Sequence, residues 1–200
     1  MSRINVLNLY AGLGGNRRLW KDVNVTAVEL NPEIAKIYKD LYPNDNVVIE
    51  DAHQYLLDNY QAYDFIWTSP PCQTHSSFRY NISVRYGRSK AVYPDMRLYQ
   101  EILFLKAHSK TKWVVENVVP YYKPLITAKQ LQRHLFWCNF DIPEIDVPKD
   151  VIRSAQIPDL QKLHGIDLSS YKIKDKRQIL RNCVNAELGK HILEQARINL

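Results

Sequence analysis

The chain has 200 residues, of which 46% are hydrophobic and 24% are charged, a composition typical of a globular protein of about one domain. Its net charge of +6 is compatible with a polyanionic partner but does not require one. No run of about 18 apolar residues is present, and the N-terminal residues lack the apolar stretch of a signal peptide. We therefore expect neither a membrane span nor secretion.

Short apolar runs alternate with stretches of helical periodicity over the first 120 residues or so. The pattern predicts strands at Ile4–Leu9, Val25–Leu30, Val47–Ile49, Asp64–Thr68 and Lys112–Glu116. It predicts helices at Leu13–Lys21, Pro32–Leu41 (with Asn31 as N-cap), Ala52–Asn59 and Met96–His108. This alternation indicates right-handed βαβ units, so we expect an α/β fold with a doubly wound, mostly parallel sheet.

Two segments depart from this alternation. Thr74–Asp95 is long, polar, basic and rich in aromatic residues, whereas Asp141–Lys176 contains Pro143, Pro148 and Pro158 and only short apolar clusters. We therefore expect a main domain at residues 1–140, a short insert at 141–177, and a C-terminal helix at 178–200 that returns to the main domain.

Polar and small residues follow the predicted strands. In a parallel sheet, functional residues gather at the carboxyl ends of the strands, where we find Gly12, Glu29, Asp51, Pro71 and Glu116. The glycines after the first strand let the backbone turn tightly and approach a ligand. Glu29 can accept hydrogen bonds from ribose hydroxyls, and Asp51 can accept one from an adenine amino group.

The chemistry of these residues favours a cofactor without phosphate. Two carboxylates face the predicted site, and no P-loop lysine follows the glycines. S-adenosylmethionine, which carries ribose, adenine and a sulfonium, fits this set. A nicotinamide cofactor is the second candidate and would need a pyrophosphate site that this loop lacks.

A nucleophile and an acid stand at neighbouring strand ends. Cys72 follows Pro70 and Pro71, which end the strand and fix the turn that presents the thiol. Glu116 follows the apolar run Trp113–Val115. An isolated cysteine is usually a small buried hydrophobe, and we assign that role to Cys138 and Cys183. The pairing of Cys72 with Glu116 instead predicts covalent catalysis assisted by an acid.

Taken in order, Asn8–Gly15, Pro71-Cys72-Gln73 and Glu116-Asn117-Val118 resemble the motifs of the cytosine-C5 DNA methyltransferase family. The resemblance runs from Asn5 to about Phe140 and resumes near Gln178. It implies a Rossmann-like S-adenosylmethionine-dependent methyltransferase fold with a small variable insert. It also implies methylation of cytosine C5 after base flipping and addition of cysteine to C6.

The resemblance carries site residues over to this chain, with two departures: Asn8 replaces the usual aspartate, and Arg181 stands where glycine is customary. Packing at the strand end is an equal interpretation for Asn8 and Tyr10. The implied catalytic residues are Cys72, Glu116, Arg133 (on the target base) and Asn117 (bracing the cysteine loop). The implied cofactor-binding residues are Tyr10, Gly12, Leu13, Gly14, Gly15, Glu29, Leu30, Asp51, Ala52, Pro71, Leu98, Asn182 and Val184.

Double-stranded DNA is the expected partner. The basic Thr74–Asp95 segment suits phosphate contacts, and the implied substrate-binding residues are Gln73, Ser76, Arg79, Arg85 and Arg88. Additional phosphate contacts are expected from Lys172, Lys174, Lys176 and Arg177. The insert is too short for an elaborate sequence reader, so we expect a short recognition site.

Several alternatives remain open. The same architecture could methylate cytosine in RNA of the tRNA type, or the chain could be a catalytically silent regulatory subunit. The six scattered histidines show no metal spacing, so we expect no metal. We expect a cytoplasmic, nucleoid-associated protein of a bacterial or phage-infected cell. Its oligomeric state, a monomer included, and any pairing with a restriction nuclease are open.

Overall fold

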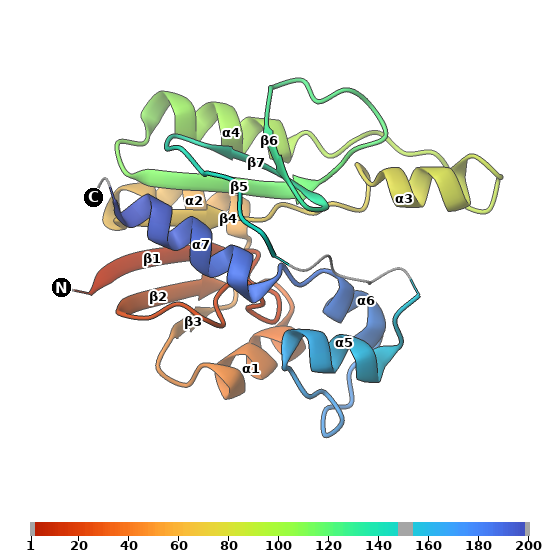
Figure 1. The fold of residues 1–200 in the computed structure, drawn as a ribbon, viewed down its shortest axis with the longest axis horizontal. Helices are drawn as coiled ribbons and strands as arrows, with labels where there is room; N and C mark the ends of the chain where they lie inside the picture. Colours follow the sequence, from red (N-terminus) through yellow and green to blue (C-terminus); the bar gives the residue numbers. More distant parts are fainter. Residues whose placement is uncertain (1–2, 148–153, 199–200) are drawn as a thin grey trace.

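The computed structural model describes residues 3–147 and 154–198. In these ranges one seven-stranded sheet has the order β3-β2-β1-β4-β5-β7-β6 (Figure 1). Strands β1 to β5 pair in parallel, and β7 pairs antiparallel with both β5 and β6. The predicted α/β fold with a mostly parallel sheet is confirmed. The strands are β1 (Ile4–Leu9), β2 (Val23–Val28), β3 (Asn46–Val48), β4 (Phe65–Thr68), β5 (Lys112–Val118), β6 (Lys129–Leu131) and β7 (His134–Cys138).

The helices at Pro32–Leu41 and Ala52–Asn59 form as predicted, and each begins at a side-chain cap. The side chain of Asn31 accepts hydrogen bonds from the amides of Glu33 and Ile34, which satisfies two donors of the first turn. The helices are α1 (Pro32–Leu41), α2 (Ala52–Asn59), α3 (Ser77–Arg79), α4 (Arg97–His108), α5 (Ile157–His164), α6 (Lys176–Arg181) and α7 (Ala186–Arg197), with a 3₁₀ turn at Tyr60–Ala62 and a π-helical turn at Tyr80–Val84.

The helix predicted at Leu13–Lys21 is wrong. This stretch is a series of tight turns, in which the amides of Gly14, Arg17 and Trp20 each donate to the carbonyl three residues earlier. Helix α7 packs against the same stretch: a Cβ on Gly189 would come within 2.3 Å of the Asn16 carbonyl oxygen. The indole of Trp20 donates to the Gly189 carbonyl. A helix from a distant part of the chain therefore lies where the sequence predicted a local one.

The sheet has a separate hydrophobic core on each face. Val6, Trp67 and Val114 share one core with Leu188 and Ile192 of α7, which crosses this face in Figure 1. On the opposite face, β-strand residues pack with α2 and α4. That second core includes Leu7, Leu9, Ile66, Val115, Leu56, Leu98, Ile102 and Leu105. Alternate side chains of each central strand thus point to opposite layers, as expected for a sheet covered on both faces.

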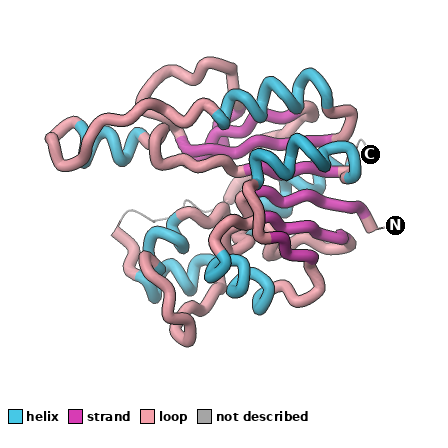
Figure 2. Tube along the Cα trace, turned by 180° about the vertical axis from the view of Figure 1, so that it is seen from behind, coloured by secondary structure: helices cyan, strands magenta, loops and turns pink. Residues whose placement is uncertain are grey.

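Two segments lie outside these layers. Thr74–Asp95, which we call the arm, projects away from the sheet and carries α3 (Figure 2). Much of the segment predicted as an insert packs beside α1, where its residues Leu160 and Leu168 share a third core with Leu13, Ile37 and Leu180, the last of which lies in α6. Pro148 of that segment lies outside the described residues. The C-terminal helix predicted from residue 178 divides into α6 and α7, separated by Asn182–Asn185.

Candidate active site

A cavity of about 330 Å³ opens at the carboxyl ends of β1, β2, β4 and β5. Its walls come from the glycine loop after β1, the cysteine loop after β4, the end of β5, and the stretch between α6 and α7. Twelve of the predicted site residues line it: Tyr10, Gly12, Leu13, Gly15, Glu29, Pro71, Cys72, Gln73, Glu116, Arg133, Asn182 and Val184.

The glycine loop is bound to β2 through Glu29. Gly12 has a φ of +54°, which favours glycine, and its amide donates to Glu29 Oε2 at 3.0 Å. The other carboxylate oxygen of Glu29 accepts from the amide of Asn31 at 2.9 Å. A Cβ on Gly12 would meet only the carbonyl oxygen of Tyr10, at 4.0 Å, so this turn borders open space. The loop and an oriented carboxylate therefore face the cavity together.

The next glycines are needed for close packing. A Cβ on Gly14 would lie 2.5 Å from the ring of Tyr42, whose hydroxyl donates to the Gly14 carbonyl. A Cβ on Gly15 would lie 2.7 Å from the carbonyl oxygen of Val184. The glycine loop is thus pressed between α1 and residues Arg181–Val184, which we call the C-terminal segment.

Asn8 has a partner within the loop that it precedes. Its Oδ1 accepts a hydrogen bond of 2.9 Å from Nδ2 of Asn16, and both side chains are buried. Asn8, which stands in place of the family's aspartate, therefore still stabilises the turn after β1 through a buried hydrogen bond. Asn16 was missed by the sequence analysis because a lone asparagine in a predicted helix gives no signal.

Cys72 begins a turn that is fixed from β5. Asn117 Nδ2 donates to the Pro70 carbonyl at 2.9 Å, so Asn117 braces the cysteine loop. The Cys72 carbonyl accepts from the amides of His75 and Ser76, both at 3.1 Å. Burial, followed by the nearby Glu116 carboxylate, raises the pKa of the Cys72 thiol to about 11, while the charge of Arg133 acts in the opposite direction. The resting thiol is therefore protonated at neutral pH.

Glu116 is a buried carboxyl group in the same cavity. Burial raises its pKa to about 7, against smaller lowering effects of the Ser69 hydroxyl and Arg133. A carboxyl group with this pKa holds its proton in about half of the molecules at neutral pH, so it can act as an acid.

Arg133, in the turn before β7, lines the cavity and is tied to the C-terminal segment. Its Nη2 donates to the carbonyls of Arg181 at 3.2 Å and Cys183 at 2.9 Å. The guanidinium thus joins the C-terminal segment to the wall that carries Glu116, besides supplying positive charge near Cys72.

Some predicted cofactor-binding residues lie outside the cavity wall. Leu30 is exposed, while Ala52 and Leu98 are buried in the core beneath α2 and α4. Asp51 caps α2, where its Oδ1 accepts from the amides of His53 and Gln54. These residues lie outside the cavity wall that contains the glycine loop and Cys72.

Glu101 on α4 is a buried carboxylate that the sequence analysis missed. Its oxygens accept hydrogen bonds of 2.6 Å from the hydroxyls of Tyr10 and Thr68, and one lies 2.9 Å from Nδ1 of His53. Burial and the Glu101 charge raise the pKa of Tyr10 well above its usual value. Glu101 therefore joins β1, β4 and α2 behind the glycine loop. A carboxylate on the apolar face of the predicted Met96–His108 helix was a signal that could have revealed it.

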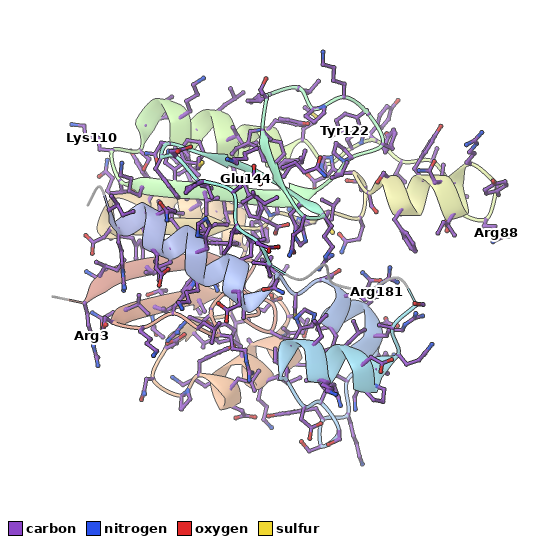
Figure 3. All side chains as sticks on the ribbon, in the orientation of Figure 1. Arg3, Arg88, Lys110, Tyr122, Glu144 and Arg181 are labelled. Carbon is purple, nitrogen blue, oxygen red and sulfur yellow. The ribbon has the colours of Figure 1, made fainter. Side chains whose placement is uncertain are left out.

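The arm carries the predicted substrate-binding arginines away from the cavity. Arg79 Nη2 donates to the Lys90 carbonyl within the arm, and the Ser76 hydroxyl accepts from the amide of Arg79. Arg88 lies near the tip of the arm (Figure 3), with its guanidinium 6.0 Å from the centroid of the Tyr86 ring. Arg85 lies in the same exposed stretch. These side chains form a basic, aromatic extension and do not join Cys72 in one pocket.

The base of the arm is anchored on two sides. Buried His75 contacts the Tyr122 hydroxyl through Nδ1 at 2.5 Å and the Asp95 carbonyl through Nε2 at 3.0 Å. On the side of the C-terminal segment, the Arg181 guanidinium lies 4.9 Å from the centroid of the Phe78 ring. Arg181, a departure from the family pattern, thus contacts the arm.

Neither a metal cluster nor a membrane span is found in the described parts of the chain. In residues 3–147 and 154–198, no three His, Cys, Asp or Glu side chains are grouped to hold a metal ion. No helix in those ranges is both long and apolar enough to cross a bilayer.

Comparisons with known proteins agree with this architecture. The family model for C-5 cytosine-specific DNA methylase matches residues 4–123. No curated protein matches the chain. The solved structure of Entamoeba histolytica methyltransferase EhMeth is similar with a TM-score of 0.60 and 10% identity, covering 100% of this chain and 99% of that one. At that identity the similarity shows the fold.

Two further solved structures share 24% identity with the chain. A mutant of Spodoptera frugiperda DNMT2 has a TM-score of 0.39, with 57% of this chain and 35% of that one covered. A putative DNA modification methyltransferase encoded within an E. coli prophage has a TM-score of 0.38, with 60% of this chain and 33% of that one covered. The chain thus spans about a third of the length of both proteins.

Proposed function

Because the chain belongs to the C-5 cytosine-specific DNA methylase family, we propose that it methylates C5 of cytosine in double-stranded DNA, with S-adenosylmethionine as methyl donor. Family membership makes it a methyltransferase of the cytosine-C5 type and implies S-adenosylmethionine; the DNA substrate and the residue roles are the proposal. One observation carries it: Cys72 and Glu116 line one cavity together with the glycine loop and Glu29.

The residues around the glycine loop suit the cofactor. When bound, S-adenosylmethionine supplies an electrophilic methyl group on a sulfonium. Glu29, already oriented by the amides of Gly12 and Asn31, keeps lone pairs for the ribose hydroxyls. The turn at Gly12 borders open space in the cavity and leaves room for the methionine part. Asp51 at the head of α2 would serve the adenine amino group, and Tyr10 its ring.

Cys72 would activate the base. Its thiolate sulfur forms a bond to C6, which moves the electrons of the C5–C6 double bond toward N3 and C5. Glu116 donates its proton to N3 and so neutralises the charge that develops there. When C5 receives the methyl group, N3 returns its proton to Glu116. Loss of the C5 proton to a base then restores the C5–C6 double bond and breaks the C6–S bond. Cysteine and carboxyl group then return to their starting states.

The raised pKa of Cys72 has a consequence for this cycle. A thiol with a pKa of about 11 is mostly protonated at neutral pH, so the thiol must release its proton to solvent as the substrate enters. Arg133 is the cation whose charge already lowers this pKa. Transfer of the Glu116 proton to N3 of the cytosine would make C6 more electrophilic, which favours addition of the thiolate.

The arm suits a duplex substrate. A base within a duplex must leave the stack before sulfur can reach C6, at a cost of a few kcal/mol. Arg79, Arg85 and Arg88 would bind phosphates of the duplex, with Ser76 nearer the cavity and Gln73 at its rim. Phosphate contacts position the protein, so the sequence specificity falls to the short segment 141–177.

The test offers both nucleic acids to the purified protein. Methyl-labelled S-adenosylmethionine is supplied with duplex DNA or with total RNA, and the product is located by bisulfite sequencing. We expect label in DNA, none with Cys72→Ser, and normal transfer with Cys138→Ser, a cysteine outside the cavity wall. A random-sequence duplex containing 5-fluorocytosine should form a covalent adduct that maps to Cys72, because fluorine cannot leave as a proton.

Three outcomes would contradict the proposal. Label in RNA alone would favour the RNA branch of the family. An adduct on another residue would refute the mechanism. Cofactor binding without transfer to either nucleic acid would favour a catalytically silent subunit.

A further inference from the structure

His134 is a buried histidine that the proposed mechanism has not used. It is the first residue of β7, is 2% exposed, and lines the same cavity as Cys72. In the antiparallel pairing of β5 with β7, Val118 lies opposite His134 and Glu116 lies opposite Phe136. Residues two positions apart on a strand share a face, so His134 is the diagonal neighbour of Glu116 on the cavity side.

The two side chains approach each other directly. His134 Nε2 lies 3.6 Å from Glu116 Oε1, slightly beyond a normal hydrogen bond. Catalytic hydrogen bonds are often long in a substrate-free enzyme and tighten in the complex. A shift of about 0.6 Å would bring this pair to the usual N–H···O distance.

We propose that His134 is a positioning residue for Glu116: its Nε2–H holds one carboxyl oxygen, so that the acidic proton resides on the other oxygen, toward N3 of the base. This inference rests on the proposed function. The inference adds to that function a residue, His134, that determines which oxygen of Glu116 donates the proton. The same residue stabilises the carboxylate once the proton has left.

The surroundings of the ring favour the tautomer that this role needs. Within the described residues, Nδ1 of His134 is buried without a hydrogen-bond partner. A neutral imidazole has one N–H and one lone pair, and an orphaned buried donor is rarer than an under-satisfied acceptor. The proton therefore belongs on Nε2, facing Glu116. Burial and the charge of Arg133 lower the pKa of His134 far below its usual value, so the ring stays neutral.

The alternative tautomer would oppose catalysis. With the proton on Nδ1, the lone pair of Nε2 would accept the proton of Glu116 and direct it away from the base. The groups that act on Glu116 in this cavity are the Cys72 thiol, the Ser69 hydroxyl, the Arg133 guanidinium and the neutral His134 ring. Of these groups, His134 is the neutral N–H donor. Its Nε2 lies near Oε1 of Glu116, so the acidic proton of Glu116 is directed to Oε2.

The sign of the effect on pH dependence follows from this geometry. Removing Nε2–H takes a donor from the carboxylate and leaves the protonated acid unchanged, so the pKa of Glu116 rises. Activity that needs protonated Glu116 then survives to higher pH. The maximal rate nevertheless falls, because the carboxylate formed on proton transfer has lost its donor.

The experiment compares His134→Leu, His134→Gln and His134→Asn. The amide nitrogen of glutamine reaches about as far as Nε2, whereas that of asparagine corresponds to Nδ1. We expect His134→Leu and His134→Asn to lower kcat by at least about tenfold. In the pH–rate profile of kcat, the alkaline limb should move to higher pH by about one unit, the scale of one hydrogen bond to a charged group. His134→Gln should restore both. His164→Leu, another buried histidine but outside the cavity wall, is the matched control.

A second measurement separates this inference from the proposed function. The Glu116 carboxyl group is titrated by 13C NMR in the free protein, with Glu116→Gln to assign the signal, and its pKa should rise in the leucine and asparagine variants. An inactive wild-type protein would refute the proposed function, while the titration would still test the contact. Equal titration curves in all variants, or a glutamine variant as impaired as asparagine, would overturn the role of His134. If the leucine variant fails to fold, the glutamine and asparagine pair decides.

Discussion

The Glu116 carboxyl group should make the free energy of unfolding depend on pH, and the isosteric substitution Glu116→Gln should remove this dependence. Burial raises its pKa from 4.5 to about 7. A raised carboxyl pKa contributes stability that is fully present below the unfolded pKa and lost as the pH rises through the folded one. Glu116→Gln keeps the shape and cannot ionise, so the variant should gain stability over the wild type as pH rises.

The size of this effect follows from the two pKa values. Each pKa unit corresponds to about 1.4 kcal/mol, so the full loss is about 3 kcal/mol. At pH 5 the Glu116 carboxyl group is already ionised in most unfolded molecules, so part of the stabilisation has been lost. The free energy of unfolding then falls by a further amount of about 2.5 kcal/mol between pH 5 and pH 8. The carboxyl group is buried, so solvent screening reduces this figure little.

Urea unfolding at pH 5 and pH 8 measures the difference. The free energy of unfolding of Glu116→Gln, minus that of the wild type, should increase by about 2.5 kcal/mol between the two values. Glu33→Gln, on the exposed first turn of α1, is the control and should show no such increase. A pH-independent difference for Glu116→Gln would show that the carboxyl group titrates normally, and would remove the basis for Glu116 as an acid near neutral pH.

Two further predictions concern ligands. Glu29→Ala should weaken S-adenosylmethionine binding by about 1.5–3 kcal/mol, the scale of hydrogen bonds to a charged group, in calorimetry; unchanged affinity would show that Glu29 is not the ribose contact. Replacing Arg79, Arg85 and Arg88 by alanine should lower DNA affinity for all sequences and flatten the salt slope by about one unit per lost phosphate contact. Arg3→Ala, far from the arm (Figure 3), is the control. A triple variant that shifts site choice at an unchanged salt slope would assign sequence reading to the arm.

The five parallel strands, α1 and α2 could be predicted because their signals are local, whereas β6 and β7 were not predicted. Apolar runs, the cap at Asn31 and the proline at the first turn of α1 specify these elements within a few residues. The helix at Leu13–Lys21 failed because the turn is stabilised by α7, about 170 residues away: Trp20 bonds to the Gly189 carbonyl, and Asn16 packs on Gly189. No local pattern records such a contact.

The site shows the same division. Cys72, Glu116 and Glu29 stand at strand ends, and the sheet order brings strand ends together, so their meeting in one cavity could be predicted. His134 could not, because its approach to Glu116 depends on the antiparallel register of β7, which the sequence does not specify. Their roles in catalysis remain predictions.

The C-terminal segment joins parts of the site that the sequence places far apart. The Val184 carbonyl lies against Gly15, so the segment closes one side of the glycine loop. Arg133 donates to two carbonyls of the segment and at the same time lies close enough to Cys72 and Glu116 to lower their pKa values. Arg181 contacts Phe78 of the arm. A movement of the arm on substrate binding would therefore shift the C-terminal segment, and with that segment the position of the Arg133 guanidinium. A shift of this charge would change the pKa of the Cys72 thiol. The positive charge that favours the Cys72 thiolate is thus held by the same residues that border the glycine loop and contact the arm.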